Sequence, residues 1–192
     1  MSTDGERGAE RIRDRERTRR AVLTAAERIF AERGTGAAIA DVAREAGVSK
    51  SGLLHHFPSR EELIGAVVAH VIAKSWEEIH ALVDPADDRP GAFTRGYLRA
   101  MTGDSPYLSE LFSASGLIAH LGTTAALGHL EGLEHDDAAR LRAAFDADGL
   151  PPGRAAAVRY AAEGIALSLN TPYLTESQRL EVRAELFALT EL

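Results

Sequence analysis

The feature that most constrains this fold is a pair of short apolar-periodic segments, joined by a glycine turn, in the first third of the chain. The apolar residues of the first segment recur at spacings of three and four residues, so they lie on one face of a helix. They are Ile39, Val42, Ala43 and Ala46. Gly47 follows, where a helix end favours a residue that tolerates a positive φ angle. The pattern therefore predicts a short helix that ends at about Ala46.

A second short helix is predicted directly after this turn. Ser49 is placed to accept a hydrogen bond from a free N–H group of the next helical turn, as an N-cap residue does. Leu53 and Phe57 can face inward, and Pro58 ends the helix. The candidate DNA contacts are Ser49 and the residues left on the exposed first turn and outer face, where a recognition helix meets the major groove, namely Lys50, Ser51, Gly52, His55 and His56.

A third helix is predicted to begin at Arg60 and to be long. Ser59 and Glu62 form the Ser-x-x-Glu pattern of a capping box, and the charge of Arg60 in the first turn can meet a DNA phosphate. Apolar residues at helical spacing continue until Asp84 and Pro85 end the pattern. One helix would thus reach from the first domain into the second.

Two interpretations of this region stand side by side. It can be a plain helical hairpin, or it can be a helix-turn-helix that binds DNA. Charge favours DNA binding, because residues 1–60 hold 12 Lys and Arg against 9 Asp and Glu, whereas residues 61–192 hold 10 against 20. In this otherwise acidic protein, the one basic region contains the helical pair. This end of the molecule is therefore suited to bind a polyanion.

The run from Ala46 to Leu63, AGVSKSGLLHHFPSREEL, resembles the DNA-binding signature of TetR-type transcriptional repressors. Residues 19–30 with Gly34 resemble the first helix of that family, and residues 41–43 its second. Two positions depart from the family pattern. Ala38 stands where the family usually has a threonine N-cap, and Leu54 stands where it usually has tyrosine. The loss of both hydroxyls removes two phosphate contacts, so that affinity depends more on Lys50, His56, Arg60 and the N-terminal arginines.

The resemblance implies an all-α protein of about nine helices. It divides the chain into a disordered or frayed arm (1–16), a three-helix DNA-binding domain (17–62) and an effector-binding and dimerisation domain (63–192). Breaks in the helical pattern place further helices at about residues 92–102, 106–121, 124–133, 136–147, 152–169 and 175–190. In the family the last two helices pack against the same two helices of a second subunit. This implies a homodimer and a palindromic double-stranded DNA operator.

The N-terminal arm is rich in arginines interleaved with acidic residues, and it has two interpretations. It can be a frayed, solvated extension of the first helix. Alternatively, Arg17, Thr18, Arg19 and Arg20 lie against the phosphate backbone or enter the minor groove beside the recognition helix.

A small-molecule effector pocket is expected in the second domain, because most aromatic residues lie there. Its predicted lining residues are Trp76, Phe93, Tyr97, Met101, Tyr107, Phe112, His120, Tyr160 and Glu163. A packed core is the alternative for each aromatic residue. Glu163 lies in a stretch suited to burial, where a buried carboxylate needs a partner, but we expect an exposed position on the helix flank.

The remaining sequence features exclude several classes of function. No apolar run is long enough for a membrane span, and the absence of cysteine excludes disulfides and thiolate metal sites. The seven histidines have no metal-ligand spacing, and no nucleophile or phosphate-loop motif is present. We therefore expect no enzyme, no metal, no cofactor and a cytoplasmic location. The alternatives to a repressor are an activator with the same contacts, or a ligand-binding or scaffold protein whose helix-turn-helix is vestigial.

Overall fold

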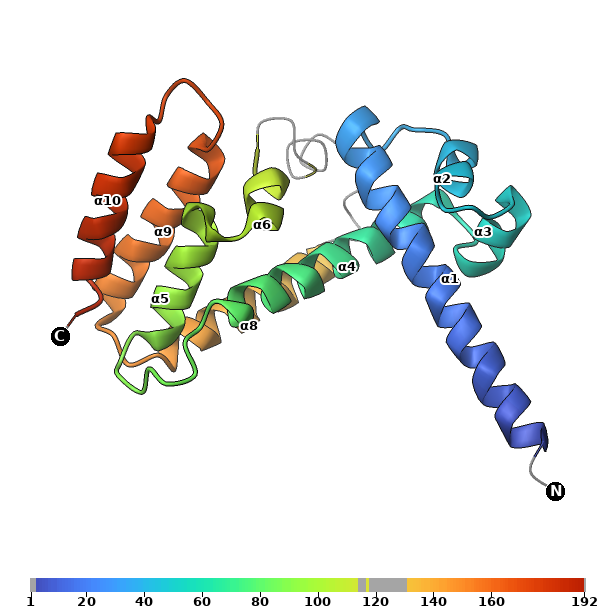
Figure 1. Cartoon of the computed structure of the whole chain (residues 1–192), viewed down its shortest axis with the longest axis horizontal. Coiled ribbons are helices and arrows are strands. Elements are labelled where there is room, and N and C mark those ends of the chain that lie inside the picture. Colours follow the sequence, from blue (N-terminus) through green and yellow to red (C-terminus); the bar gives the residue numbers. More distant parts are fainter. Residues whose placement is uncertain (1–2, 114–116, 118–130, 192) are drawn as a thin grey trace.

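The computed structural model describes residues 3–113, 117 and 131–191, and these residues form helices and no strand. Helices α1 (Thr3–Arg33), α2 (Ile39–Glu45) and α3 (Lys50–His56) form one end of the molecule, and α4 (Arg60–Ala81) runs from this end into a helical bundle (Figure 1). The bundle contains α5 (Ala92–Arg99), the π-helical segment η1 (Ala100–Asp104), α6 (Pro106–Leu111), α8 (Glu131–Asp146), α9 (Pro152–Ser168) and α10 (Glu176–Ala188). The predicted all-helical fold is confirmed.

Helix α1 begins earlier than the sequence predicts. Residues 1–16 are expected to be disordered or frayed, whereas the helix starts at Thr3 and projects away from the body of the molecule (Figure 1). Its side chains from Glu10 to Arg17 lie in solvent, and Asp14 and Arg17 pair across one turn at 3.2 Å. Opposite charges at this spacing stabilise a solvated helix, which accounts for the difference. From Val22 onward, α1 buries an apolar face.

The turn between α2 and α3 has the predicted geometry. Helix α2 ends at Glu45 with Ala46 as its C-cap, and Gly47 adopts a φ angle of +68°. Only a residue without a Cβ takes this conformation at no steric cost, so the glycine sets the direction of the following chain. The N–H group of Val48 then closes the turn on the carbonyl of Ala43 at 2.9 Å.

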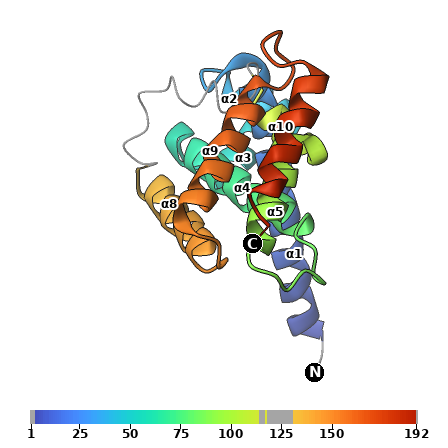
Figure 2. The same ribbon diagram turned by 90° about the vertical axis from the view of Figure 1, so that its left-hand side faces the viewer.

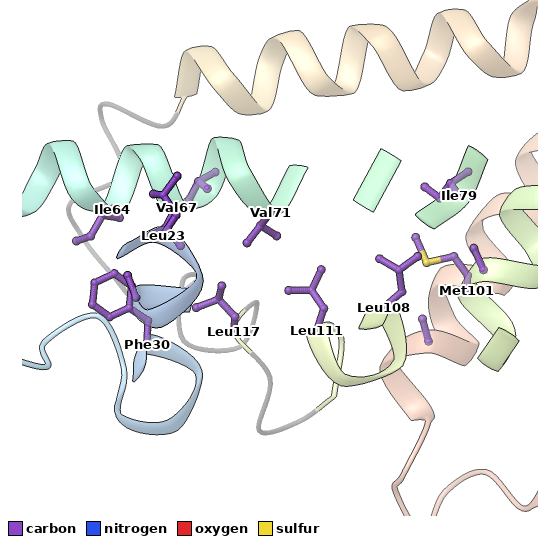
Figure 3. Close-up of a cluster of buried hydrophobic side chains, with 14 of the residues drawn as sticks. Leu23, Phe30, Ile64, Val67, Val71, Ile79, Met101, Leu108, Leu111 and Leu117 are labelled. Atoms are coloured by element: carbon purple, nitrogen blue, oxygen red, sulfur yellow. The ribbon is translucent and has the colours of Figure 1, made fainter. Parts of the chain in front are cut away.

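Helix α4 is continuous, as its apolar pattern predicts. Ser59 Oγ accepts a hydrogen bond from the N–H group of Glu62 at 3.1 Å, which is the N-cap half of the predicted capping box. Buried residues along α4 pack on both ends of the molecule: Ile64 and Val67 lie beside Phe30 and Leu23 of α1, and the distal part lies beside η1 and α6 (Figure 3). One apolar core therefore follows α4 from the helix-turn-helix into the bundle.

The bundle differs from the predicted helix boundaries in two places. Residues 106–121 are expected to be one helix, but α6 ends at Leu111 with Phe112 as its C-cap. A break is expected between residues 133 and 136, but α8 is continuous from Glu131 to Asp146. Most of the helix expected at 124–133 lies outside the described residues. Among the helices described, none combines the length and apolarity needed to cross a bilayer.

Candidate DNA-binding surface and effector cavity

One face of helix α3 packs against the rest of its domain, and the opposite face is exposed to solvent. Leu53 and Phe57 are 0% and 2% exposed, so they fix the helix against its domain. Ser49 Oγ accepts a hydrogen bond from the Gly52 N–H at 3.0 Å, which confirms it as the N-cap. A Cβ at position 52 would lie 3.2 Å from Ser49 Oγ, so the glycine leaves room for the cap. Lys50 is exposed at the start of this rigid helix, as a base-reading side chain must be.

A group of basic side chains, here called the basic rim, lies beside the C-terminal end of α3 and consists of Arg15, Arg19, His55 and His56. The guanidinium carbon of Arg19 lies 4.9 Å from the centroid of the Phe57 ring, which ties α1 to the end of α3. Partial burial, followed by the nearby charges of Arg15, His55 and Arg19, lowers the pKa of His56 below its ordinary value. The imidazole of His56 is therefore neutral at neutral pH in the free protein, although it lies in a positive potential that attracts phosphate.

Two of the arginines predicted to contact DNA have partners within the protein. Arg60 Nη1 donates to the carbonyl of Thr35 at 2.6 Å, so its side chain fastens the start of α4 to the turn that follows α1. Arg17 is 81% exposed and pairs with Asp14. The sequence pattern missed the Arg60 contact, because the two residues are 25 positions apart and meet only after α2 and α3 have packed.

A cavity of about 380 Å³ lies within the bundle, between α4, α5, α8 and α9. Five of the nine residues predicted for an effector pocket line it, namely Trp76, Tyr97, Met101, Phe112 and Glu163. Apolar residues of α4 and α8 complete much of the wall, among them Val71, Ile72, Ile79 and Leu141. The cavity thus has the size and the mostly apolar lining of a small-molecule site.

The polar groups of this cavity are held by defined partners. Glu163 Oε1 accepts hydrogen bonds from the Tyr97 hydroxyl at 2.9 Å and from Arg159 Nε at 2.8 Å. Burial, with the carboxylate of Glu163, raises the pKa of Tyr97 well above its ordinary value, so this hydroxyl stays protonated. Asp137 Oδ1 accepts a hydrogen bond from the indole N–H of Trp76 at 2.7 Å. Glu163 is therefore a paired, partly buried carboxylate, and the expectation of a freely exposed one is wrong.

The other predicted pocket residues lie elsewhere. The ring of Phe93 stacks on Trp76 with centroids 6.0 Å apart and packs behind the cavity wall. Tyr107 faces a different cavity, next to α1. Tyr160 is 64% exposed, because it lies on the outer face of α9, so its assignment to the pocket is wrong. His120 lies outside the described residues.

Sequence reasoning missed several residues of this wall. Ser75, Asp137 and Leu141 line the cavity, but none of them stands out in the sequence. Asp137 is one of several acidic residues on a polar helix, and only the packing of α8 against α4 brings it to the Trp76 indole. A polar residue that faces inward from an otherwise solvated helix gives no periodic signal.

A group of exposed apolar side chains belongs to α9, to α10 and to the turn between them, and these two helices pack side by side on one side of the molecule (Figure 2). Most of the large apolar side chains that the described residues leave in solvent belong to these helices or to the turn between them. They include Tyr160 (64% exposed), Tyr173 (89%) and Leu180 (52%), together with Leu167 (57%), which also lines the effector cavity. Exposed apolar side chains that gather on one surface are typical of protein interaction sites.

A helix-turn-helix joined by one long helix to a bundle that encloses a cavity defines a class of DNA-binding transcriptional regulators with a separate regulatory domain. Residues 22–67 match the family of bacterial regulatory proteins named tetR, and residues 91–191 match the tetracyclin repressor-like C-terminal domain. The two matches include both the helix-turn-helix and the bundle. The chain belongs to the TetR family of bacterial transcriptional regulators.

Individual relatives agree with this assignment. The chain is 31% identical to the transcriptional repressor Rv3405c of Mycobacterium tuberculosis over 134 residues, which are 62% of this chain and 71% of the relative. It is 40% identical to the repressor LfrR of Mycolicibacterium smegmatis over 77 residues, but these span only 38% of LfrR. A crystal structure of a Rhodococcus transcriptional regulator has the same fold, with a TM-score of 0.65, 23% identity and coverage of 89% and 95% of the two chains.

Proposed function

We propose that this protein is a homodimeric, cytoplasmic transcriptional repressor that a small, partly apolar effector releases from a palindromic operator. The observation that carries the proposal is the course of α4. Its first residue, Arg60, donates a hydrogen bond to the carbonyl of Thr35 in the helix-turn-helix domain. Trp76 of the same helix forms part of the cavity wall. A continuous helix of 22 residues is about 33 Å long and transmits displacement between its two ends.

For the DNA-bound state, we assign base reading to the first turn of α3. Lys50 is exposed and positively charged, which suits the acceptor edge of guanine, and Ser51 is a secondary contact. His56, Arg60 and Arg19 hold phosphates and so fix the register of the helix on the duplex. The basic rim at the end of α3 supports this division of roles.

For the release step, the effector occupies the cavity beside Trp76 and Tyr97 and favours a conformation whose recognition helices are wrongly spaced. A coupling free energy of about 1 to 3 kcal/mol would weaken DNA binding by about 5- to 150-fold. The hydrogen-bonded Tyr97 and Glu163 supply polar positions that orient a ligand in an otherwise apolar wall.

The apolar outer face of α9 and α10 supports a two-fold dimer. Two copies that bury this face against each other form an isologous four-helix contact and direct two α3 helices toward one DNA duplex. The half-sites are then about 34 to 36 Å apart, or a multiple of this distance, and the operator is palindromic.

Selection of bound sites from a random duplex DNA library, with the purified protein at near-physiological salt, tests this proposal. We expect a palindrome to be enriched and the affinity to fall steeply as the salt concentration rises. The Lys50→Ala variant serves as the specificity control, since it keeps the fold but lacks the base-reading group. If no sequence is enriched, the helix-turn-helix is vestigial and the protein is a helical ligand-binding or scaffold protein.

A further inference from the structure

The polar groups that line the effector cavity offer a ligand more acceptors than donors. The indole N–H of Trp76 is already donated to Asp137 Oδ1 at 2.7 Å, and the Tyr97 hydroxyl is donated to Glu163 Oε1 at 2.9 Å. The second carboxylate oxygen of each acidic residue has no hydrogen bond from the described part of the chain. Because a carboxylate only accepts hydrogen bonds, a ligand that pairs with these oxygens must donate.

The charge of the cavity wall is also one-sided. Asp137 and Glu163 line the cavity, and no lysine, arginine or histidine is among the lining residues in the part of the chain that the structure describes. The sequence between α6 and α8, residues 112–130, contains neither lysine nor arginine. A partly buried site of this composition favours a cation over an anion of the same shape, since like charges repel most where water is excluded.

The two carboxylates differ in what balances their charge. Arg159 Nε lies 2.8 Å from Glu163 Oε1, so Glu163 has a cationic partner on α9. The side chain of Asp137 has one polar contact within the described residues, the neutral indole N–H of Trp76. The nearby Arg140 lies over the Trp76 ring, 4.0 Å from its centroid, and lines a separate pocket between α4 and α8. Asp137 is therefore the carboxylate of the cavity that lacks an ion pair of its own.

The rest of the wall suits the apolar part of a ligand and holds Asp137 in place. Ile79 and Met101 belong both to the apolar core (Figure 3) and to the cavity wall. Trp76 is 6% exposed and stacks on Phe93, so the indole that fixes the Asp137 carboxylate is itself fixed. A charged group and an apolar body can thus meet different parts of one rigid wall.

We propose that the effector is a protonated organic amine with an apolar body, and that Asp137 is the residue that selects its charge. The inference rests on the proposed function, because it names the class of compound that occupies the effector cavity. The ammonium group donates to the second oxygen of Asp137, and the apolar body packs against the core side of the wall. Compounds with a carboxylate or phosphate group bind weakly, because they meet two carboxylates.

Three probes of matched shape test this assignment, namely phenethylamine, phenethyl alcohol and phenylacetate. They share an aromatic ring and a short chain, and they end in a cation, a neutral hydroxyl and an anion. Isothermal titration calorimetry of the full-length protein measures their affinities. The emission of Trp76, the only tryptophan of the chain, reports whether a bound probe lies in the effector cavity.

We expect phenethylamine to bind at least about tenfold more tightly than phenethyl alcohol, with phenylacetate the weakest. Asp137→Asn should remove this preference and leave the affinity for the alcohol unchanged, because the amide still accepts the indole hydrogen bond but has no charge. Unchanged binding of the alcohol also shows that the cavity of the variant is intact. Asp137→Glu keeps the charge and should keep part of the preference.

Asp136→Asn is the matched control for the loss of charge. Asp136 is the neighbouring residue on α8, is exposed, and does not line the effector cavity. Its variant removes the same charge from the same helix and should change the affinity of either probe by less than about twofold. An equal loss of amine binding in Asp136→Asn and Asp137→Asn would reduce the effect to the overall charge of α8 and overturn the proposal.

Other outcomes would overturn the ligand class and leave the repressor standing. Equal affinities for the amine and the alcohol, or an equal effect of Asp137→Asn on both, would show that Asp137 does not select charge. Amine binding without a change in Trp76 emission would place the site elsewhere. If no probe binds, the amine assignment fails, and site selection from the random DNA library then decides the wider question. An enriched palindrome confines the failure to the ligand, whereas no enrichment means that the proposed function has failed as well.

Discussion

The guanidinium of Arg60 donates a 2.6 Å hydrogen bond to the carbonyl of Thr35, and this contact joins the first turn of α4 to the end of α1. A charged donor to a partly buried carbonyl contributes about 1.5 to 3 kcal/mol to stability. We therefore expect Arg60→Ala to lower the free energy of unfolding by about this amount in urea denaturation. Arg142→Ala, at an exposed position on α8, is the control and should change it by less than about 0.5 kcal/mol.

Removal of Lys50 should affect DNA sequence preference more than general DNA affinity. A side chain that reads one base contributes about 1 to 3 kcal/mol of discrimination, so Lys50→Ala should relax the preference at one position of each half-site. Site selection with the variant and with the parent protein measures this directly. Arg142→Ala again serves as the charge-matched control. An unchanged position-by-position preference would show that another residue reads the bases.

Operator binding should strengthen as the pH falls through the range in which histidine titrates. The pKa of His56 is lowered in the free protein by burial and neighbouring cations, whereas a bound phosphate favours the protonated form and raises it. Each protomer therefore takes up a proton on binding, and affinity rises between about pH 7.5 and about pH 6, by at most tenfold per pH unit for each of the two protomers of the proposed dimer. His56→Gln should flatten this dependence in fluorescence anisotropy, and His135→Gln, on the exposed surface of α8, should retain it. A parent protein whose affinity does not vary with pH would remove His56 from the contact set.

The outer face of α9 and α10 should determine the oligomeric state. Leu180 is 52% exposed on this face, and Leu180→Glu places a charge where two apolar surfaces are proposed to meet. We expect the variant to sediment as a monomer at micromolar concentration, where the parent protein is a dimer. Ile12→Glu is the matched control, because Ile12 is 66% exposed on the distant arm of α1. A dimer that survives Leu180→Glu would place the interface elsewhere.

Local sequence rules predicted the helix-turn-helix closely, because its turn and caps depend on single residues such as Gly47 and Ser49. The continuity of α4 also followed from its own apolar pattern. The cavity was predicted only in part, because residue type alone does not separate Tyr97, which faces inward, from Tyr160, which faces solvent. The direction of those side chains depends on how α9 packs against α5, and that contact joins segments far apart in the sequence.

The position of the only tryptophan gives this molecule a built-in optical probe. The indole of Trp76 lies in the wall of the effector cavity, donates to Asp137, and lies 4.0 Å from the guanidinium carbon of Arg140. All indole emission from the protein therefore originates beside that cavity, and its intensity and wavelength respond to the polarity of whatever enters. Compounds can thus be screened against the unlabelled protein in a cuvette, without DNA and before the operator sequence has been identified.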